Sequence, residues 1–463
     1  MFNLINTNRL IASDSYKTSQ FPAYPEYMDG MFAYGEARKA NEIVVSAGLV
    51  YAINRYLSTP ITQEEIDEAA AFIQAHGEPF NREGWEYILN TYRGYFPITI
   101  RAIPEGTPIP SRLPMFTVEC TDKQAMFLVS YIETWLLRGA WYSSTIVSQG
   151  YQSKKFIKEY YEISGADMAN LPFALLDFSG RGVTCGEQAQ LAGMAHMYNY
   201  MGSDTMEGIA TANKLFNTPM AGFSVPASEH NNAISFGEDD EEGYIKAMLD
   251  NYAKPGAVVS IVTDAYDPYR FTELVCDNFG DQIITSCATV VLRPDAGDPE
   301  EMLGWMLPRL AKRFGFTSNA KGFKKLNHVK ILWGDGINSM SIRTIYGFVV
   351  AHGWAADNIL LGSGGGLMQS CNRDTYAWAM KGSAKLVDGK WIGMSKRPST
   401  DPSKRSKEGR VSTAVNAAGD HICYDIDHGL PEGFTDAMVT LYSNGTIYEN
   451  PTMDEIRARM GNW

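Results

Sequence analysis

The sequence has little cysteine and no long uncharged apolar run. Six cysteines are scattered over 463 residues, and no two of them form a Cys-x-x-Cys pair. This pattern predicts neither a disulfide framework nor a zinc site, and reduced thiols in a cytoplasmic protein are the simplest account. The most apolar helical stretch, residues 125–142, contains Glu133 and Arg138, so it indicates a buried helix and not a membrane span. The first residues turn polar too soon for a secretory signal.

Positive charge is also in short supply. Lys and Arg number 40 against 53 Asp and Glu, a formal net charge of −13. This balance argues against a nucleic-acid-binding surface, although it permits a local basic pocket. One basic run, residues 396–410, would normally be a solvated loop, but in an acidic protein it is also a reasonable partner for a polyphosphate. The length predicts one large domain with an elaboration, or two domains that share a core.

The first 165 residues predict a mixed α+β layer. An apolar run at residues 31–34 indicates a strand, and short runs between residues 95 and 114, broken by Pro and Gly, indicate antiparallel strands. Thr62-Gln63-Glu64-Glu65 is a capping box that predicts a helix ending near Gly77. Thr121-x-x-Gln124 is a second such pattern, followed by helical periodicity as far as Gly165.

From residue 173 onward, short apolar runs repeatedly end in polar clusters. The runs cover residues 173–176, 222–225, 257–262, 290–292, 329–333 and 358–361, and amphipathic segments at 300–314 and 341–352 lie between them. Alternating strands and helices predict a parallel sheet. A barrel is favoured over a doubly wound open sheet because polar residues follow nearly every strand.

Two of these strand ends suggest anion binding. Arg293 and Asp295 follow the run at 290–292; an arginine suits phosphate, and a carboxylate suits ribose hydroxyls or a developing cation. A structural Arg–Asp ion pair is the alternative. The glycine-rich stretch 362–366 lets backbone N–H groups approach oxyanions closely, although a tight turn is as good an account of that stretch alone.

Nine motifs along nearly the whole chain resemble one family. They are Asp14-Ser15-Tyr16-Lys17, Asp177-Phe178-x-x-Arg181-Gly182, Gly202-x-Asp204-Thr205, Ser224-Val225-Pro226-Ala227-x-Glu229-His230, Asp264-x-Tyr266-Asp267, Arg293-Pro294-Asp295-x-Gly297, Gly334-Asp335-Gly336, Gly362-Ser363-Gly364-Gly365-Gly366-Leu367 and Asp401-Pro402-x-Lys404-Arg405-Ser406-Lys407-x-Gly409-Arg410. Their order and spacing resemble the nicotinamide phosphoribosyltransferases, the type II phosphoribosyltransferases of NAD salvage. The resemblance implies an irregular TIM-like α/β barrel over residues 166–380. An accessory α+β domain, built from residues 1–165 and 381–463, would pack on the barrel and on a dimer partner.

The family's reaction joins nicotinamide to phosphoribosyl pyrophosphate, giving nicotinamide mononucleotide and pyrophosphate. The resemblance implies that Mg²⁺ is held by the pyrophosphate without direct protein ligands, and that ATP is a co-substrate which phosphorylates His230. It also implies a cytoplasmic homodimer with two shared active sites, acting on neither nucleic acid nor membrane.

The motifs carry the family's roles onto residues of this chain. Phe178 and, from the other subunit, Tyr16 would sandwich the pyridine ring, and Asp204 would accept from the carboxamide NH₂ group. The full set divides into a nicotinamide pocket of Phe178, Tyr16, Asp204, Arg181 and Asp14; a phosphate and ribose site of Arg293, Asp295, Gly334, Asp335, Gly364, Gly365, Arg373, Arg38, Lys381 and Lys396; and a catalytic group of His230, Asp264, Arg293 and Asp295.

Other interpretations stay open at this point. A nicotinate phosphoribosyltransferase would share the barrel and the histidine, but Asp204 would repel the carboxylate of nicotinate. A non-catalytic binding or signalling protein on the same scaffold is a second alternative. Without the resemblance, the preferred interpretation of His230 is a hydrogen-bonded core or rim residue. The acidic run at residues 238–242 is expected to be a solvated face.

Overall fold

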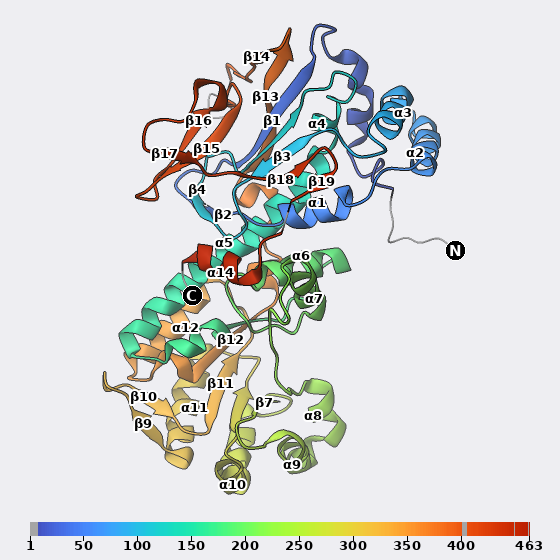
Figure 1. Cartoon of the computed structure of the whole chain (residues 1–463). Coiled ribbons are helices and arrows are strands. Elements are labelled where there is room, and N and C mark those ends of the chain that lie inside the picture. Colours follow the sequence, from blue (N-terminus) through green and yellow to red (C-terminus); the bar gives the residue numbers. More distant parts are fainter. Residues whose placement is uncertain (1–7, 401–404, 449, 462) are drawn as a thin grey trace. The chain divides into compact units, whose positions relative to one another are not determined.

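The chain forms two compact units in the computed structural model, which describes residues 8–400, 405–448, 450–461 and 463 (Figure 1). The first unit contains the residues up to Ser148, Leu215–Asn217 and Cys371–Met460, and the second contains Gln149–Lys214, Thr218–Ser370 and Gly461–Trp463. Part of the basic run, residues 401–404 with Lys404, lies outside the described residues. The boundaries expected at residues 165 and 380 stay a prediction.

The first unit is built on a seven-stranded sheet with the order β14-β13-β1-β5-β3-β18-β19. The strands, in chain order, are β1 Gly30–Ala37, β3 Thr99–Ala102, β5 Phe116–Cys120, β13 Trp378–Val387, β14 Lys390–Gly393, β18 Val439–Ser443 and β19 Thr446–Ile447. Their pairings are antiparallel, as the sequence predicts for residues 95–114. The smaller sheets pair β2 Ile43–Val45 with β4 Pro108–Pro110, and β15 Val411–Asn416 with β16 His421–Asp425 and β17 Phe434–Asp436.

Helices and a large apolar core cover this sheet. The helices are α1 Leu49–Leu57, α2 Gln63–Ala75, α3 Arg82–Thr91, α4 Leu128–Tyr131, the start of α5 Glu133–Ser164, and α14 Met453–Met460. In the core, the ring of Trp85 packs edge-on against Phe127 and Tyr131, with centroids 5.1 Å away in each pair. Aromatic pairs at this spacing stabilise a core beyond the area that they bury.

Local sequence signals explain several of these elements. Thr62 caps α2 in a complete capping box with Glu65, as predicted. The turn between β13 and β14 is formed by Asp388 and Gly389, whose φ values of 48° and 74° suit the two-residue hairpin that this pair predicts. The expected capping box at Thr121 is wrong: Asp122 accepts from the N–H of Gln124 at 2.8 Å, and α4 begins only at Leu128, without a side-chain cap.

The second unit contains a curled, parallel, five-stranded sheet with the order β6-β12-β11-β8-β7. Its strands are β6 Leu175–Asp177, β7 Val258–Val262, β8 Thr289–Arg293, β11 Val329–Trp333 and β12 Ile359–Ser363. All four pairings are parallel, so the predicted parallel α/β arrangement is confirmed at this level. The strand expected at 222–225 is not formed; instead isolated parallel bridges join Asp177 to Ser203, Gly202 to Phe223, and Ala227 to Ser260.

Helices alternate with these strands in the sequence (Figure 1). They are α6 Gly186–His196, α7 Met206–Leu215, α8 His230–Phe236, α9 Glu241–Tyr252, α10 Pro268–Ser286, α11 Pro299–Phe314, α12 Ser339–Ala351 and α13 Gly365–Met368; a short hairpin pairs β9 Phe316–Ser318 with β10 Lys324–Leu326. The cap of α11 is Asp298, which accepts from the N–H of Glu301 at 2.9 Å. Among the described residues, no helix combines the length and hydropathy that crossing a membrane requires.

The acidic run at residues 238–242 is exposed, as expected of a solvated face, except at Glu241. The last two residues of the run are the first two of α9, and the side chain of Glu241 is only 4% exposed. Arg270 of α10 reaches Glu241 with an Nη2–Oε2 distance of 2.8 Å. The first turn of α9 therefore packs against a cation on the neighbouring helix, which periodicity alone does not reveal.

Candidate functional site

Arg293, Asp295 and Asp264 meet at the carboxyl ends of β7 and β8. Arg293 is the last residue of β8, and its Nη2 lies 3.6 Å from Oδ2 of Asp295. This ion pair is loose, and Nε of Arg293 is buried without a hydrogen-bond partner. Asp264 follows β7, and its Oδ2 accepts from the backbone N–H of Asp295 at 2.9 Å. The arginine therefore has donor capacity left for a ligand.

The charges around Asp295 are not fully compensated. Burial raises the pKa of Asp295; Arg293 opposes this shift, and the negative charges of Asp264 and Asp335 add to it. Gly334 lies against this carboxylate, because a Cβ at Gly334 would be 2.6 Å from Oδ1 of Asp295. The loop after β11 thus approaches Asp295 at a point where no side chain fits.

His230 joins the same cluster. It is the first residue of α8, and its Nε2 lies 3.2 Å from Oδ1 of Asp264. The histidine side chain is 46% exposed, whereas that of Asp264 is only 6% exposed. Asp264 therefore holds both an accessible imidazole and the backbone of the loop that follows β8. His230 is not a core residue.

The aromatic wall of the site is Phe178, which follows β6. Its backbone N–H donates to the carbonyl of Ser363, at the end of β12, at 2.9 Å. Its ring lies directly on Gly362, where a Cβ would be 2.2 Å from ring atom Cε2 and 2.6 Å from Cδ2. A side chain at position 362 would occupy the space of the ring. Phe178 can therefore lie where it does only because residue 362 is a glycine.

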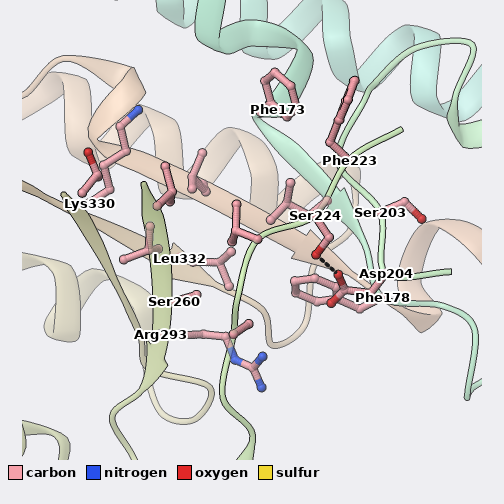
Figure 2. Close-up of a pocket in the computed structure, with 18 of the residues that line it drawn as sticks. Phe173, Phe178, Ser203, Asp204, Phe223, Ser224, Ser260, Arg293, Lys330 and Leu332 are labelled. Atoms are coloured by element: carbon pink, nitrogen blue, oxygen red, sulfur yellow. Dashed lines mark hydrogen bonds between the residues drawn. The ribbon is translucent and has the colours of Figure 1, made fainter. Parts of the chain in front are cut away.

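Asp204 stands beside this ring on the loop after α6. Oγ of Ser224 donates to Oδ1 of Asp204 at 2.6 Å, as Figure 2 shows. The backbone N–H of Asp204 donates to the carbonyl of Asp177 at 2.9 Å. Sequence reasoning assigned Asp204 to the site but gave no role to Ser224, although Ser224 opens one of the nine motifs.

Asp177 holds these loops together. Its carboxylate is fully buried and accepts from the N–H of Ser179 at 2.8 Å and from Oγ of Ser203 at 2.9 Å. The loop carrying Phe178 and the loop carrying Asp204 are therefore bound to one side chain. Sequence analysis missed this role. The signal available was a carboxylate placed directly after an apolar run.

Two neighbouring cavities share these groups. One, of about 430 Å³, contains Phe178, Asp204 and Ser224 at one side and Lys330 at the opposite side (Figure 2). Burial lowers the pKa of Lys330, and Asp357 opposes that shift. The other cavity, of about 620 Å³, brings together the predicted residues Phe178, Arg181, Asp204, Arg293, Asp295, Gly334, Gly364 and Gly365. Asp335 lines neither cavity, although its charge acts on Asp295.

The remaining predicted residues belong to the first unit. Tyr16, in a 3-10 helix at Ser15–Ser19, is 58% exposed. Its neighbours are anchored on α5: Oδ2 of Asp14 accepts from Thr134 at 2.8 Å, and Nζ of Lys17 lies 2.6 Å from Glu133.

Within the first unit, three predicted cations act on a fourth. Burial lowers the pKa of Lys381, Glu133 opposes the shift, and the positive charges of Arg38, Lys396 and Arg373 lower the pKa further. We call these four residues the cation cluster. The positive charge gathered around Lys381 marks a place where a polyanion would be stabilised.

Comparison with known proteins settles the family. The model of the nicotinate phosphoribosyltransferase (NAPRTase) family matches residues 173–429. The chain belongs to this family. A second model, the N-terminal domain of nicotinamide phosphoribosyltransferase, matches residues 8–100. Membership of the NAPRTase family makes the chain a phosphoribosyltransferase, an enzyme, and confirms the resemblance found in its motifs.

Relatives and solved structures agree with this assignment. The nicotinamide phosphoribosyltransferase of Xanthomonas campestris pv. campestris (strain 8004) is 40% identical over 460 residues, covering 97% of both chains. That of Acinetobacter baylyi is 28% identical and covers 98% of this chain and 97% of its own. The nicotinate-nucleotide pyrophosphorylase of Pyrococcus furiosus has a TM-score of 0.65 at 16% identity, covering 99% of this chain and 97% of its own. Human nicotinic acid phosphoribosyltransferase has a TM-score of 0.56 at 14% identity, covering 97% and 93%. These two structures share the NAPRTase fold with the chain.

Proposed function

We propose that the enzyme transfers the phosphoribosyl group of phosphoribosyl pyrophosphate to nicotinamide, giving nicotinamide mononucleotide and pyrophosphate for NAD salvage. The observation that carries this choice of substrate is the carboxylate of Asp204 beside the ring of Phe178 in one cavity. A carboxylate accepts hydrogen bonds from an amide NH₂ group and repels a second carboxylate. The name shared by the Xanthomonas and Acinetobacter relatives supports the same substrate.

The pyridine ring of nicotinamide would lie flat on Phe178. Aromatic faces pair favourably in offset stacks. Arg181, which lines the larger cavity, would donate to the ring substituent or to the nucleotide phosphate. The ring nitrogen would then point toward Arg293 and Asp295, where the sugar binds.

The phosphoribosyl group would occupy the cluster at the ends of β8, β11 and β12. Arg293 has a buried Nε without a partner, and the hydroxyl groups of Thr263 and Ser363 are also buried without hydrogen bonds. Unsatisfied buried polar groups are costly in an empty site and become partners when a polar ligand binds. Gly364 and Gly365 offer backbone N–H groups close to the sugar phosphate.

In the reaction, the pyridine nitrogen attacks the anomeric carbon while the bond from that carbon to the pyrophosphate oxygen breaks. Positive charge develops on the sugar, and the carboxylate of Asp295 stabilises it. The nitrogen carries no proton in nicotinamide, so no general base is required. Orientation of the two substrates on rigid strand ends supplies much of the rate.

Mg²⁺ fits this scheme as a companion of the pyrophosphate. Across the described part of the chain, no group of three or more His, Cys, Asp or Glu side chains could hold a metal ion by itself. When bound, Mg²⁺ would neutralise charge on the leaving pyrophosphate.

We extend the proposal to ATP and His230. In the tautomer whose Nε2–H donates to Asp264, the lone pair of His230 lies on Nδ1. Nδ1 would attack the γ-phosphorus of ATP, the bond to the ADP oxygen would break, and a phosphohistidine and ADP would result. The exposure of His230 supports access by a nucleotide, and water would later remove the phosphoryl group.

A homodimer with shared sites completes the proposal. Tyr16 of the partner subunit would cover the open face of the pyridine ring. The exposed ring of Tyr16 and its anchoring on α5 support a role in contact with another surface. The cation cluster would bind polyphosphate in the same arrangement.

We further propose that the curled sheet closes into an irregular barrel. The bridges at Ser203, Phe223 and Ala227 extend the sheet from β6 and from β7 toward each other. Such a ring of strand ends places loops distant in sequence at one rim.

The test is a direct comparison of substrates with purified enzyme, phosphoribosyl pyrophosphate and Mg²⁺. Nicotinamide should be converted to its mononucleotide with a much higher kcat/KM than nicotinate. Asp204→Asn, which keeps the size and removes the charge, should narrow that ratio. A preference for nicotinate in the unmodified enzyme would show that the substrate is wrong, and a lack of pyrophosphate release with either base would favour a binding or signalling role.

A further inference from the structure

Ser224 makes one hydrogen bond with its side chain, and that bond is to Asp204. A carboxylate oxygen accepts and a hydroxyl donates, so Oγ of Ser224 is the donor to Oδ1 of Asp204 in the 2.6 Å contact. Both side chains line the cavity that holds Phe178, and both residues are exposed. The bond therefore does not belong to the buried core of the unit.

The two ends of this bond are fixed by backbone contacts. Next to Ser224, Phe223 donates from its N–H to Met201 at 2.7 Å and accepts from Ser203 at 3.1 Å. Next to Ser203, the N–H of Asp204 donates to Asp177 at 2.9 Å. Rotation about the side-chain bonds of Asp204 is then the main freedom left, and the hydroxyl of Ser224 restricts it.

This arrangement has a consequence for the base that binds. Ser224 takes one acceptor position on Oδ1, so the remaining lone pairs of Asp204, chiefly those of Oδ2, are left for a base in the cavity that Asp204 lines. A carboxamide NH₂ group can donate to Oδ2 without reorientation of Asp204. A carboxylate substituent is repelled by the negative charge of Asp204, because the bond to Ser224 keeps that side chain from rotating.

We propose that Ser224 is a specificity-determining positioning residue that holds Asp204 in the orientation required to accept from a carboxamide and to repel a carboxylate. The inference rests on the proposed transfer to nicotinamide. Ser224 acts through Asp204, away from the anomeric carbon, so its effect falls on KM and on the choice of base more than on kcat.

The experiment measures kcat and KM for nicotinamide and for nicotinate in Ser224→Ala. Hydrogen bonds to charged groups commonly change binding by about tenfold or more when lost. We expect the KM for nicotinamide to rise by about this factor, kcat to change little, and the ratio of kcat/KM between the two bases to fall about tenfold. Ser224→Thr keeps the hydroxyl and should keep the ratio.

Two controls separate positioning from a general disturbance. Ser318→Ala removes an exposed hydroxyl from β9 in the same unit, at a residue that lines neither cavity, and should leave both substrates unaffected. In an Asp204→Asn background, Ser224→Ala should change the ratio of kcat/KM between the two bases very little, because the charge that Ser224 orients is gone. A double-mutant cycle measures this coupling.

The outcomes distinguish this inference from the function on which it rests. If the unmodified enzyme does not use nicotinamide, the proposed function fails. If it does, and Ser224→Ala keeps the substrate ratio within about twofold, which is well below the loss expected for a charged hydrogen bond, the role of Ser224 is wrong and the function stands. Two other results would also overturn the role of Ser224. One is an equal fall of the substrate ratio when Ser224→Ala is made in the Asp204→Asn background. The other is a collapse of that ratio in a folded Ser224→Thr variant.

Discussion

The substrate slot depends on a strand residue that has no side chain. Gly362 lies within β12, and the ring of Phe178 rests on its Cα. A methyl group at this position would lie 2.2 Å, 2.6 Å and 3.1 Å from three atoms of the ring. Carbon atoms not bonded to each other do not approach so closely, so Gly362→Ala must displace the ring, the strand, or both.

The size of the effect follows from the overlap. Non-bonded carbon atoms settle at about 3.5–4.0 Å, so the ring of Phe178 must move by more than 1 Å, on the order of the difference between 2.2 Å and that range. The ring cannot retreat freely, because its backbone N–H is tied to Ser363. Overpacking of this kind costs roughly 1–3 kcal/mol of folding free energy, so Tm should fall. The displaced ring also loses its stacking on the base, a contact worth about 0.5–1.5 kcal/mol, so we expect the KM for nicotinamide to rise up to about tenfold.

Steady-state kinetics and thermal unfolding test this together. Gly347→Ala is the matched control, because it adds the same methyl group within α12, where the nearest atom outside the helix, Oη of Tyr160, is 3.4 Å away. The control should keep its KM, and its Tm should not fall, because alanine suits a helix interior better than glycine does. A second variant, Gly362→Ala with Phe178→Leu, replaces the ring by a smaller side chain and should recover Tm but not nicotinamide affinity. Unchanged KM and Tm in Gly362→Ala alone would refute the steric reasoning.

Three further predictions concern charge, ATP and subunits. Burial raises the pKa of Asp295, so its ionised form destabilises the folded chain at pH values above the ordinary carboxyl pKa. Asp295→Asn should therefore raise Tm near neutral pH, and this gain in Tm should shrink as the pH falls toward ~4. The same variant should lose activity. A gain that is the same at both pH values would contradict this. His230→Ala should abolish stimulation by ATP yet keep slow ATP-independent turnover, which coupled kinetics with and without ATP would reveal; stimulation that persists would exclude the phosphohistidine. Mixing Tyr16→Ala with Arg293→Ala chains should restore part of the activity, and no recovery despite demonstrated subunit exchange would exclude a shared site.

The strand ends were the most predictable part of the molecule. The runs that became β7, β8, β11 and β12 are apolar and β-branched, so burial on both faces could be inferred from composition, and the polar residues after them necessarily lie at one edge of a parallel sheet. Arg293, Asp295 and Gly364 were placed on this basis together with the family resemblance. The segment 222–225 has a similar composition but forms only a bridge at Phe223, because pairing depends on neighbours that local pattern does not specify.

What the sequence could not supply is contact between side chains distant along the chain. The bond from Ser224 to Asp204 spans 20 positions, and the approach of Gly362 to Phe178 spans a still longer stretch. Both depend on which loops the sheet brings together. The same limit explains why the burial of Glu241 was not foreseen, because Arg270 reaches it from the next helix. The error at Thr121 is local: the neighbouring Asp122 accepts from the N–H of Gln124 instead.

Each of the two units holds a buried ionisable residue that lies beside charges of its own sign. In the second unit, burial raises the pKa of Asp295, and neighbouring carboxylates raise it further; in the first unit, burial lowers the pKa of Lys381, and neighbouring cations lower it further. A chain selected for stability alone would pair or expose such groups, as it does with Arg309 between Glu273 and Asp277. Groups left buried beside like charges are typical of sites whose missing counter-charge comes from a ligand.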